Sequence, residues 1–286
     1  MTAGVAAADV SFGGTAGIAF IDDNGASDAT RDGMFVESYY DFDVSLSAEA
    51  SNGLTMSAGF DMGGGAKVDY DDDDKLEVQG KSIGDADVAV SYNGWTLTVD
   101  QEGISNLYDD DPNEYEDMSI AGSIGGLSVA LTTDLEDSTN SYKIGYSLGD
   151  VALTLTGTND DDAGGDASGI SVSYPMGALT LAASISDESN DAEDDTEISV
   201  SYAMDALTVK YTSITPGSNG SMGDEWDAKI SYATGAMSAS INLDEADATT
   251  MIAEYDLGGG ATAFAAMHDK PGTASDLTAF GVNFKF

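Results

Sequence analysis

A long run of strictly alternating residues near the N-terminus limits what this chain can fold into. Phe35 to Phe60 reads FVESYYDFDVSLSAEASNGLTMSAGF, and from Val36 to Ala50 its even positions are mostly apolar while its odd positions are mostly polar. A period of two is typical of β-strands, because successive side chains point to opposite faces. The pattern breaks at Ser51 to Gly53, and so short a Ser-Asn-Gly break indicates a tight hairpin turn.

The same alternation recurs to the end of the chain and predicts eighteen strands. Their apolar runs span residues 10–20, 36–50, 54–62, 88–92, 95–99, 118–124, 127–131, 142–148, 151–155, 170–174, 179–185, 198–202, 207–211, 226–232, 237–243, 251–255, 261–267 and 280–286. Short turns alternate with longer acidic connections, such as 63–84, 159–166, 187–195 and 212–225. The orientation of 261–267 stays open, because Phe264 and Met267 fall on opposite parities.

Charge excludes several classes of partner. The chain has 52 acidic and 9 basic residues, a formal charge of −43, which excludes nucleic acid and would repel an anionic membrane surface. It has no cysteine, so neither disulfides nor thiol chemistry arise. No apolar run has the length of a transmembrane helix.

The apolar face of these strands favours a barrel in a membrane over a sandwich in water. A sandwich also alternates, but its core needs large, closely packed residues, whereas this face mixes Val, Leu and Ile with many Ala, Gly and Ser. A closed antiparallel sheet also pairs every backbone amide in hydrocarbon. Tyrosines that precede short turns suggest an aromatic girdle at one membrane interface. They are Tyr92, Tyr146, Tyr174, Tyr202, Tyr232 and Tyr255.

Residues 1–8 resemble the end of a signal peptide. Ala6 and Ala8 fit an A-x-A-like cleavage site directly before Asp9, where the first alternating run begins. We therefore expect a single barrel over 9–286, exported to the outer membrane of a Gram-negative bacterium. The alternative is an ordinary flexible terminus.

Several stretches together resemble the trimeric general-diffusion porins of alphaproteobacteria. They are TAGVAAADVSFGGTAGIAF, FDVSLSAEASNGLTMSAGF, YNGWTLTVDQEGISNLYDDD, YDLGGGATAFAAM and the terminal FGVNFKF. The resemblance implies a water-filled barrel, a homotrimer, a third loop (101–117) folded into the pore, and Phe286 as a C-terminal assembly signal. Members of this family usually have sixteen strands and a longer third loop, so we expect sixteen to eighteen strands.

If the apolar positions of each strand face lipid, the alternate positions face the inside of the barrel, and this places the charged side chains. The inward acidic residues would be Glu37, Asp41, Asp43, Glu49, Asp61, Asp87, Asp100, Glu197 and Asp227, and the inward basic ones Lys143, Lys210, Lys229 and Lys285. The resemblance adds a constriction loop with Asp109, Asp110, Asp111, Glu114 and Glu116. Rings of carboxylates concentrate cations, so the sequence predicts a cation-preferring pore. The alternative is that many of these carboxylates are simply solvated or protonated.

Other functions find less support in the sequence. The acidic clusters 109–111, 160–162 and 187–195 could hold Ca²⁺ or bridge lipopolysaccharide through divalent ions, although none has the spacing of an EF-hand. His268 is the only histidine and is expected to begin a loop, so we expect neither a catalytic triad nor an enzyme. Two alternatives remain: a non-conducting structural or adhesive outer-membrane barrel, and a soluble acidic β protein from a salt-rich environment.

Overall fold

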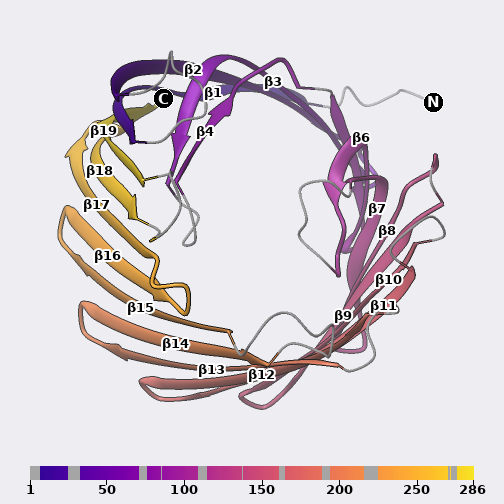
Figure 1. The fold of residues 1–286 in the computed structure, drawn as a ribbon. Coiled ribbons are helices and arrows are strands. Elements are labelled where there is room, and N and C mark those ends of the chain that lie inside the picture. The colour runs from indigo at the N-terminus through magenta and orange to yellow at the C-terminus, as the bar shows by residue number, and fades with distance from the viewer. Residues whose placement is uncertain are drawn as a thin grey trace.

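The computed structural model describes residues 7–24, 33–70, 76–84, 86–108, 115–136, 138–160, 165–188, 194–215, 225–269, 271 and 276–286. These residues form nineteen β-strands joined in one sheet (Figure 1). Within those ranges, no helix is long and apolar enough to cross a membrane.

The strands follow the expected alternating runs along the whole chain. They are β1 (Ala7–Asn24), β2 (Gly33–Glu49), β3 (Thr55–Asp69), β4 (Glu77–Gly80), β5 (Asp87–Tyr92), β6 (Trp95–Ser105), β7 (Tyr115–Ile124), β8 (Leu127–Thr133), β9 (Asn140–Leu148), β10 (Val151–Asp160), β11 (Gly165–Met176), β12 (Leu179–Glu188), β13 (Asp195–Met204), β14 (Leu207–Thr215), β15 (Glu225–Thr234), β16 (Met237–Asp244), β17 (Thr249–Gly258), β18 (Ala261–Asp269) and β19 (Asp276–Lys285).

The sheet closes on itself because its first strand pairs with its last. Strand β1 pairs antiparallel with β2 along one edge and with β19 along the other. At the seam, Gly14 and Phe286 exchange two backbone hydrogen bonds, each 3.0 Å long. A closed sheet has no free edge, so the backbone amides of the wall are paired within the wall.

Eighteen of the described strands form the wall, as the sequence predicts. The remaining one, β4, pairs with the end of β3, while the beginning of β3 pairs with β5. The short connections have the expected turn chemistry. At the β5–β6 turn Asn93 and Gly94 have φ of 51° and 80°, and at the β7–β8 turn Gly125 and Gly126 have φ of 61° and 87°. Positive φ at both central residues is the type I′ geometry that suits a two-residue hairpin.

The expectation of a simple loop over 63–84 is wrong. Strand β3 continues to Asp69 and pairs there with β4, which makes a hairpin that is not part of the barrel wall. Pairing between β2 and β3 ends at Gly65, which has φ of 85° and leaves no room for a side chain, because a Cβ there would lie 2.0 Å from the carbonyl oxygen of Ser38. Glycine at this position lets β3 leave the wall.

The N-terminal boundary lies slightly before the expected one. Strand β1 begins at Ala7, where Ala7 and Ala8 pair with Glu49 and Ala48 of β2. Residues 1–6 lie outside the described residues, so the signal peptide stays a prediction.

Candidate permeation pathway

Two segments that are not part of the wall contact one of its faces and show that this face is the inner one. From the end of β6, the backbone NH of Leu107 donates to Ser141 Oγ on β9 over 2.8 Å, and Asn106 Nδ2 donates to Thr158 Oγ1 on β10 over 3.0 Å. Ser141 and Thr158 belong to the polar parity of their strands. The β3–β4 hairpin contacts the same polar parity elsewhere, and Figure 1 shows β4 reaching from the wall toward the middle of the ring.

The third loop is shorter than 101–117. Strand β6 extends to Ser105 and β7 begins at Tyr115, where Ser105 pairs with Tyr115 and Ile104 with Glu116. The extra pairing follows an irregularity in register after Val99. Glu116 is only 1% exposed. The other expected loop carboxylates, Asp109, Asp110, Asp111 and Glu114, lie outside the described residues.

An acidic patch gathers on three neighbouring wall strands. Asp41 and Asp43 lie on β2, Asp61 on β3 and Asp87 on β5, and Asp43 is directly opposite Asp61. The ammonium nitrogen of Lys81 lies 3.0 Å from Oδ2 of Asp41 and neutralises part of this patch. Sequence reasoning missed Lys81, because it follows β4 in a segment that was expected to be a loop.

The remaining expected acidic residues are spread around the wall. Glu37 lies on β2 nearer the long-connection end than Asp41, and Glu49 ends β2 beside the first short turn. Asp100 lies on β6 where the register becomes irregular. Glu197 of β13 is opposite Ser184, and Asp227 of β15 is opposite Thr212 and Asp244. These residues share the polar parity of their strands but are not neighbours.

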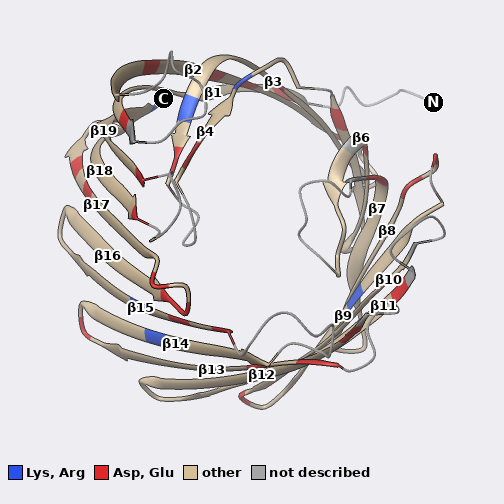
Figure 2. Ribbon diagram, in the orientation of Figure 1, with Lys and Arg blue, Asp and Glu red and all other residues tan. Residues whose placement is uncertain are grey.

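The expected basic residues occupy other strands. Lys210 of β14 lies directly opposite Lys229 of β15, which puts two like charges side by side. Lys143 of β9 is opposite Ala130 and Thr156, and Lys285 of β19 is opposite Thr15. Figure 2 shows basic positions on β9 and β14 well away from β2 and β3, while acidic positions occur all around the ring.

A hydrogen-bonded set that the sequence did not reveal lies under the hairpin. The Tyr70 hydroxyl donates to Oε1 of Glu254 on β17 over 3.1 Å and accepts from Nδ2 of Asn283 on β19 over 3.2 Å. Tyr39 of β2 donates to Asn283 Oδ1 over 3.3 Å, and Ser238 of β16 donates to Glu254 Oε2 over 3.1 Å. The sequence carries one signal, an alternation of Val68 and Tyr70 that resumes as Leu76 and Val78 after the acidic tip.

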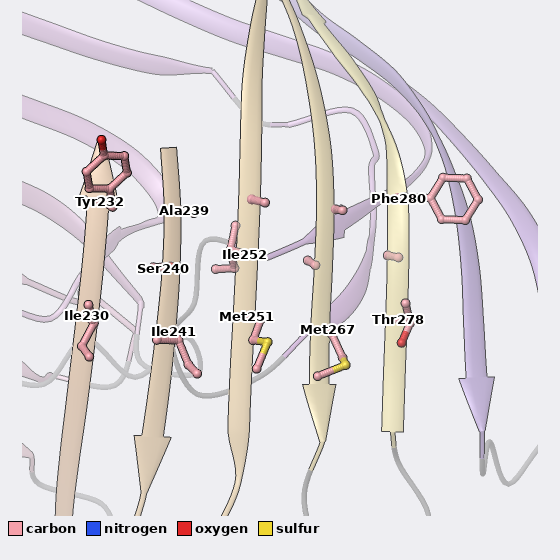
Figure 3. Close-up of a pocket in the computed structure, with 14 residues that line it drawn as sticks. Ile230, Tyr232, Ala239, Ser240, Ile241, Met251, Ile252, Met267, Thr278 and Phe280 are labelled. Atoms are coloured by element: carbon pink, nitrogen blue, oxygen red, sulfur yellow. The ribbon is translucent and has the colours of Figure 1, made fainter. Parts of the chain in front are cut away.

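The same contacts settle the orientation of β18. Phe264 points to the inner face, where its ring stacks on Tyr70 with centroids 4.5 Å apart. Met267 lies on the outer face, directly opposite Met251, as Figure 3 shows. The inner wall at this point is therefore apolar, contrary to a uniform alternation of lipid-facing apolar and inward polar residues.

The outer face is apolar and exposed. Large side chains such as Phe12, Val36 and Leu46 are 67%, 52% and 42% exposed. The six tyrosines expected to form the girdle are exposed as well, and each lies within a few residues of a short turn. Phe286, with its ring against Gly14, is exposed at the seam of the barrel.

A hollow of about 550 Å³ lies on the outer face over β15 to β19. Ala239, Ala253 and Ala265 are paired in a row across three strands and form its floor, because their side chains are small. Tyr232 and Phe280 stand at its two sides (Figure 3). Small side chains in this row leave a dent in a surface that is otherwise covered by larger apolar groups.

Neither the histidine nor the acidic clusters form a reactive centre among the described residues. His268 lies within β18 and does not begin a loop, so that expectation is wrong, and its Nδ1 is 2.9 Å from the buried Thr250 hydroxyl. Within the described ranges no three His, Cys, Asp or Glu side chains are grouped as metal ligands. Most of the clusters proposed for Ca²⁺ lie outside those ranges, so calcium binding stays a prediction.

A model of the Gram-negative porin family matches residues 1–275. The chain belongs to the Gram-negative porin family. No curated protein matches this porin. Its fold resembles solved structures of Rhodopseudomonas blastica porin variants. One variant with three substitutions has a TM-score of 0.61 at 18% identity, covering 97% of this chain and 100% of that one. Another triple mutant has a TM-score of 0.60 at 20% identity with the same coverage.

The family and the closed barrel identify the molecule as an outer-membrane channel. Both confirm the expected fold class and the resemblance on which several expectations depended. A porin is a channel and not an enzyme, so the expectation of no catalysis is confirmed by the family. Pore lining, ion preference and assembly are separate questions.

Proposed function

We propose that this porin lets ions and small hydrophilic solutes diffuse passively through a water-filled bore that favours cations. The observation that carries this proposal is the acidic patch on β2, β3 and β5, where Asp43 and Asp61 are directly opposite each other. Like charges this close are tolerated where water solvates them, which supports an aqueous inner face.

The distribution of charge supports the preference for cations. Nine expected inward carboxylates stand against four expected inward lysines, and Lys81, which the sequence did not reveal, is already paired with Asp41. Acidic lining residues raise the local concentration of cations and lower that of anions. Lys210 and Lys229 add a local positive region to the same face, two residues from Asp227.

The third loop supports a bore that is narrower than the wall alone would allow. Its described beginning, Asn106 to Tyr108, is fixed to the inner face by hydrogen bonds to β9 and β10. Tyr108 lines a groove of about 280 Å³ with Thr156, Ser171 and other small polar groups of β10 to β12.

We propose a homotrimer embedded in outer-membrane lipid and lipopolysaccharide, and export by a signal peptide that ends at Ala8. The trimer and the lipid partners are supported by the family and by the exposed apolar outer face. An unboiled sample should run on a gel as a compact oligomeric band that shifts on heating. A monomeric band under mild detergent would contradict the trimer.

Planar bilayers test the proposed channel directly. The purified porin should produce discrete single-channel currents, and in a potassium chloride gradient the sign of the reversal potential should correspond to cation flow. An anion-selective sign would overturn the ion preference. A membrane that remains silent while the protein is inserted would instead favour a structural or adhesive barrel.

A further inference from the structure

The hairpin formed by the end of β3 and by β4 lies inside the barrel and has two different faces. Because successive residues of a strand alternate, Val68, Tyr70, Leu76 and Val78 share one face, and Lys67, Asp69, Glu77 and Gln79 share the other. The first face is almost completely buried, with Val68, Tyr70 and Leu76 at 2%, 5% and 7% exposure.

The buried face packs against the inner wall where that wall is apolar. One cluster joins Val68, Tyr70 and Leu76 to Ala19 and Ile21 of β1, to Phe264 and Ala266 of β18, and to Leu277 and Ala279 of β19. Ile21 and Ala279 are fully buried, although they lie on the parity that faces the bore elsewhere. A side chain as large and apolar as Ile21 would be costly against water, so these residues match the hairpin that covers them.

Hydrogen bonds fix the hairpin to the wall in addition to this packing. Tyr70 bonds to both Glu254 and Asn283, which come from β17 and β19. At the base, the Lys81 NH donates to the Gly65 carbonyl over 2.9 Å, and the Lys81 ammonium pairs with Asp41. The hairpin is thus held at Tyr70 and at its base.

We propose that this hairpin is a second built-in constriction, and that its face carrying Lys67, Asp69, Glu77 and Gln79 is a specificity-determining surface for solutes in the bore. This inference rests on the proposed function. With one face on the wall, the opposite face points toward the axis of the barrel. A second layer of sheet lies about 10 Å from the first, so the hairpin narrows the bore by about that distance on this side.

The polar face suits this role because it is charged and accessible. Asp69 is directly opposite Glu77, and Lys67 is opposite Gln79, whose Nε2 donates to Glu77 Oε1 over 3.0 Å. Beside the hairpin, Tyr70, Lys229, Ser231, Ser240 and Glu254 line a recess of about 240 Å³. A small solute with hydroxyl or charged groups would meet hydrogen-bonding partners here from both the hairpin and the wall.

Thiol modification tests the position of the hairpin, since the chain has no cysteine of its own. In Gln79→Cys, a bulky neutral methanethiosulfonate added to a conducting bilayer should lower the single-channel current in discrete steps. Asp150→Cys, in the exposed turn between β9 and β10, should be labelled equally with no change in current. Modification of Gln79→Cys without a loss of current, or failure to label it, would overturn the inference.

A pair of neighbouring substitutions tests the docking. Val68→Asp puts a charge into the apolar cluster and should release the hairpin, which would raise the conductance or add transitions between conductance levels. Lys67→Asp, one residue away on the polar face, should keep the current level and increase the preference for cations. Equal conductance in Val68→Asp and wild type would count against the inference alone, whereas a wild type without current would overturn both it and the proposed function.

Discussion

Asp43 of β2 lies directly opposite Asp61 of β3, so two carboxylates face the same side of the wall at one height. In the cross-strand register, like charges placed directly opposite each other destabilise a sheet. The arrangement is understandable if water and mobile cations occupy the space in front of the pair. The Asp43–Asp61 pair is therefore the place on the wall where carboxylates should act most strongly on permeating ions.

Removing this pair of charges should weaken the selectivity and spare the fold. The variant Asp43→Asn with Asp61→Asn should lower the ratio of cation to anion permeability, with cations losing up to about fivefold per charge, because a unit charge about 4 Å from an ion in water contributes about 1 kcal/mol. Reversal potentials in a salt gradient measure the ratio. Asp150→Asn, at an exposed turn, is the control and should leave it unchanged. A double variant as selective as the wild type would refute the assignment.

Neutralising the opposed lysines should have the reverse effect. Lys210 and Lys229 are neighbours across β14 and β15, and the change Lys210→Gln with Lys229→Gln removes the main positive region of the proposed lining. The cation preference should increase, and it should fall with rising salt concentration as the remaining carboxylates are screened. The same reversal-potential measurement at low and high salt decides the point, and a lower cation preference is the result that the account forbids.

The base of the inner hairpin should depend on one glycine for a steric reason. Gly65→Ala places a Cβ 2.0 Å from the Ser38 carbonyl oxygen at φ of 85°, whereas Gly53→Ala has almost the same φ, 84°, in open space. A left-handed conformation costs a non-glycine residue about 1–2 kcal/mol, so both variants should be less stable than the wild type by about this amount. Gly65→Ala should lose more stability than Gly53→Ala because of the steric clash. Urea unfolding of the detergent-solubilised porins measures the difference in the free energy of unfolding. Equal losses would show that β3 does not bend here as described.

The Tyr70 hydroxyl should contribute to stability through two hydrogen bonds. Tyr70→Phe keeps the ring on Phe264 but removes the bonds to Glu254 and Asn283, and each such bond typically contributes about 0.5–1.5 kcal/mol. Tyr39→Phe removes only the bond to Asn283 and should cost about half as much. Urea midpoints compare the two variants. If Tyr39→Phe proved the more destabilising, the role assigned to Tyr70 would be wrong.

The wall could be predicted from the sequence because, in a membrane barrel, the two-residue period identifies both the strands and the face of each strand that meets lipid. Each wall strand contains an expected run, and turns such as Asn93–Gly94 and Gly125–Gly126 have the residues that their positive φ values require. Loops carry no such period. That is why the third loop was expected over 101–117, although Ser105 and Tyr115 still pair.

The hairpin inside the bore could not be predicted, because its contacts join parts of the chain that are far apart. Glu254 and Asn283 bond to Tyr70 from strands about two hundred residues away in the sequence. No residue pattern near Tyr70 indicates these partners. The apolar inner residues of β18 and β19 were a sign that something covers them. Phe264 on the unexpected parity was the clearest such sign.

The central claim is that adjacent residues of one strand face water and hydrocarbon in turn, and β2 offers the sharpest comparison. Ser45 and Leu46 are neighbours in its middle, both exposed, in a chain without cysteine. In lipid vesicles, a water-soluble, membrane-impermeant thiol reagent should label Ser45→Cys rapidly and leave Leu46→Cys unlabelled. Labelling of Leu46→Cys with protection of Ser45→Cys would contradict the account.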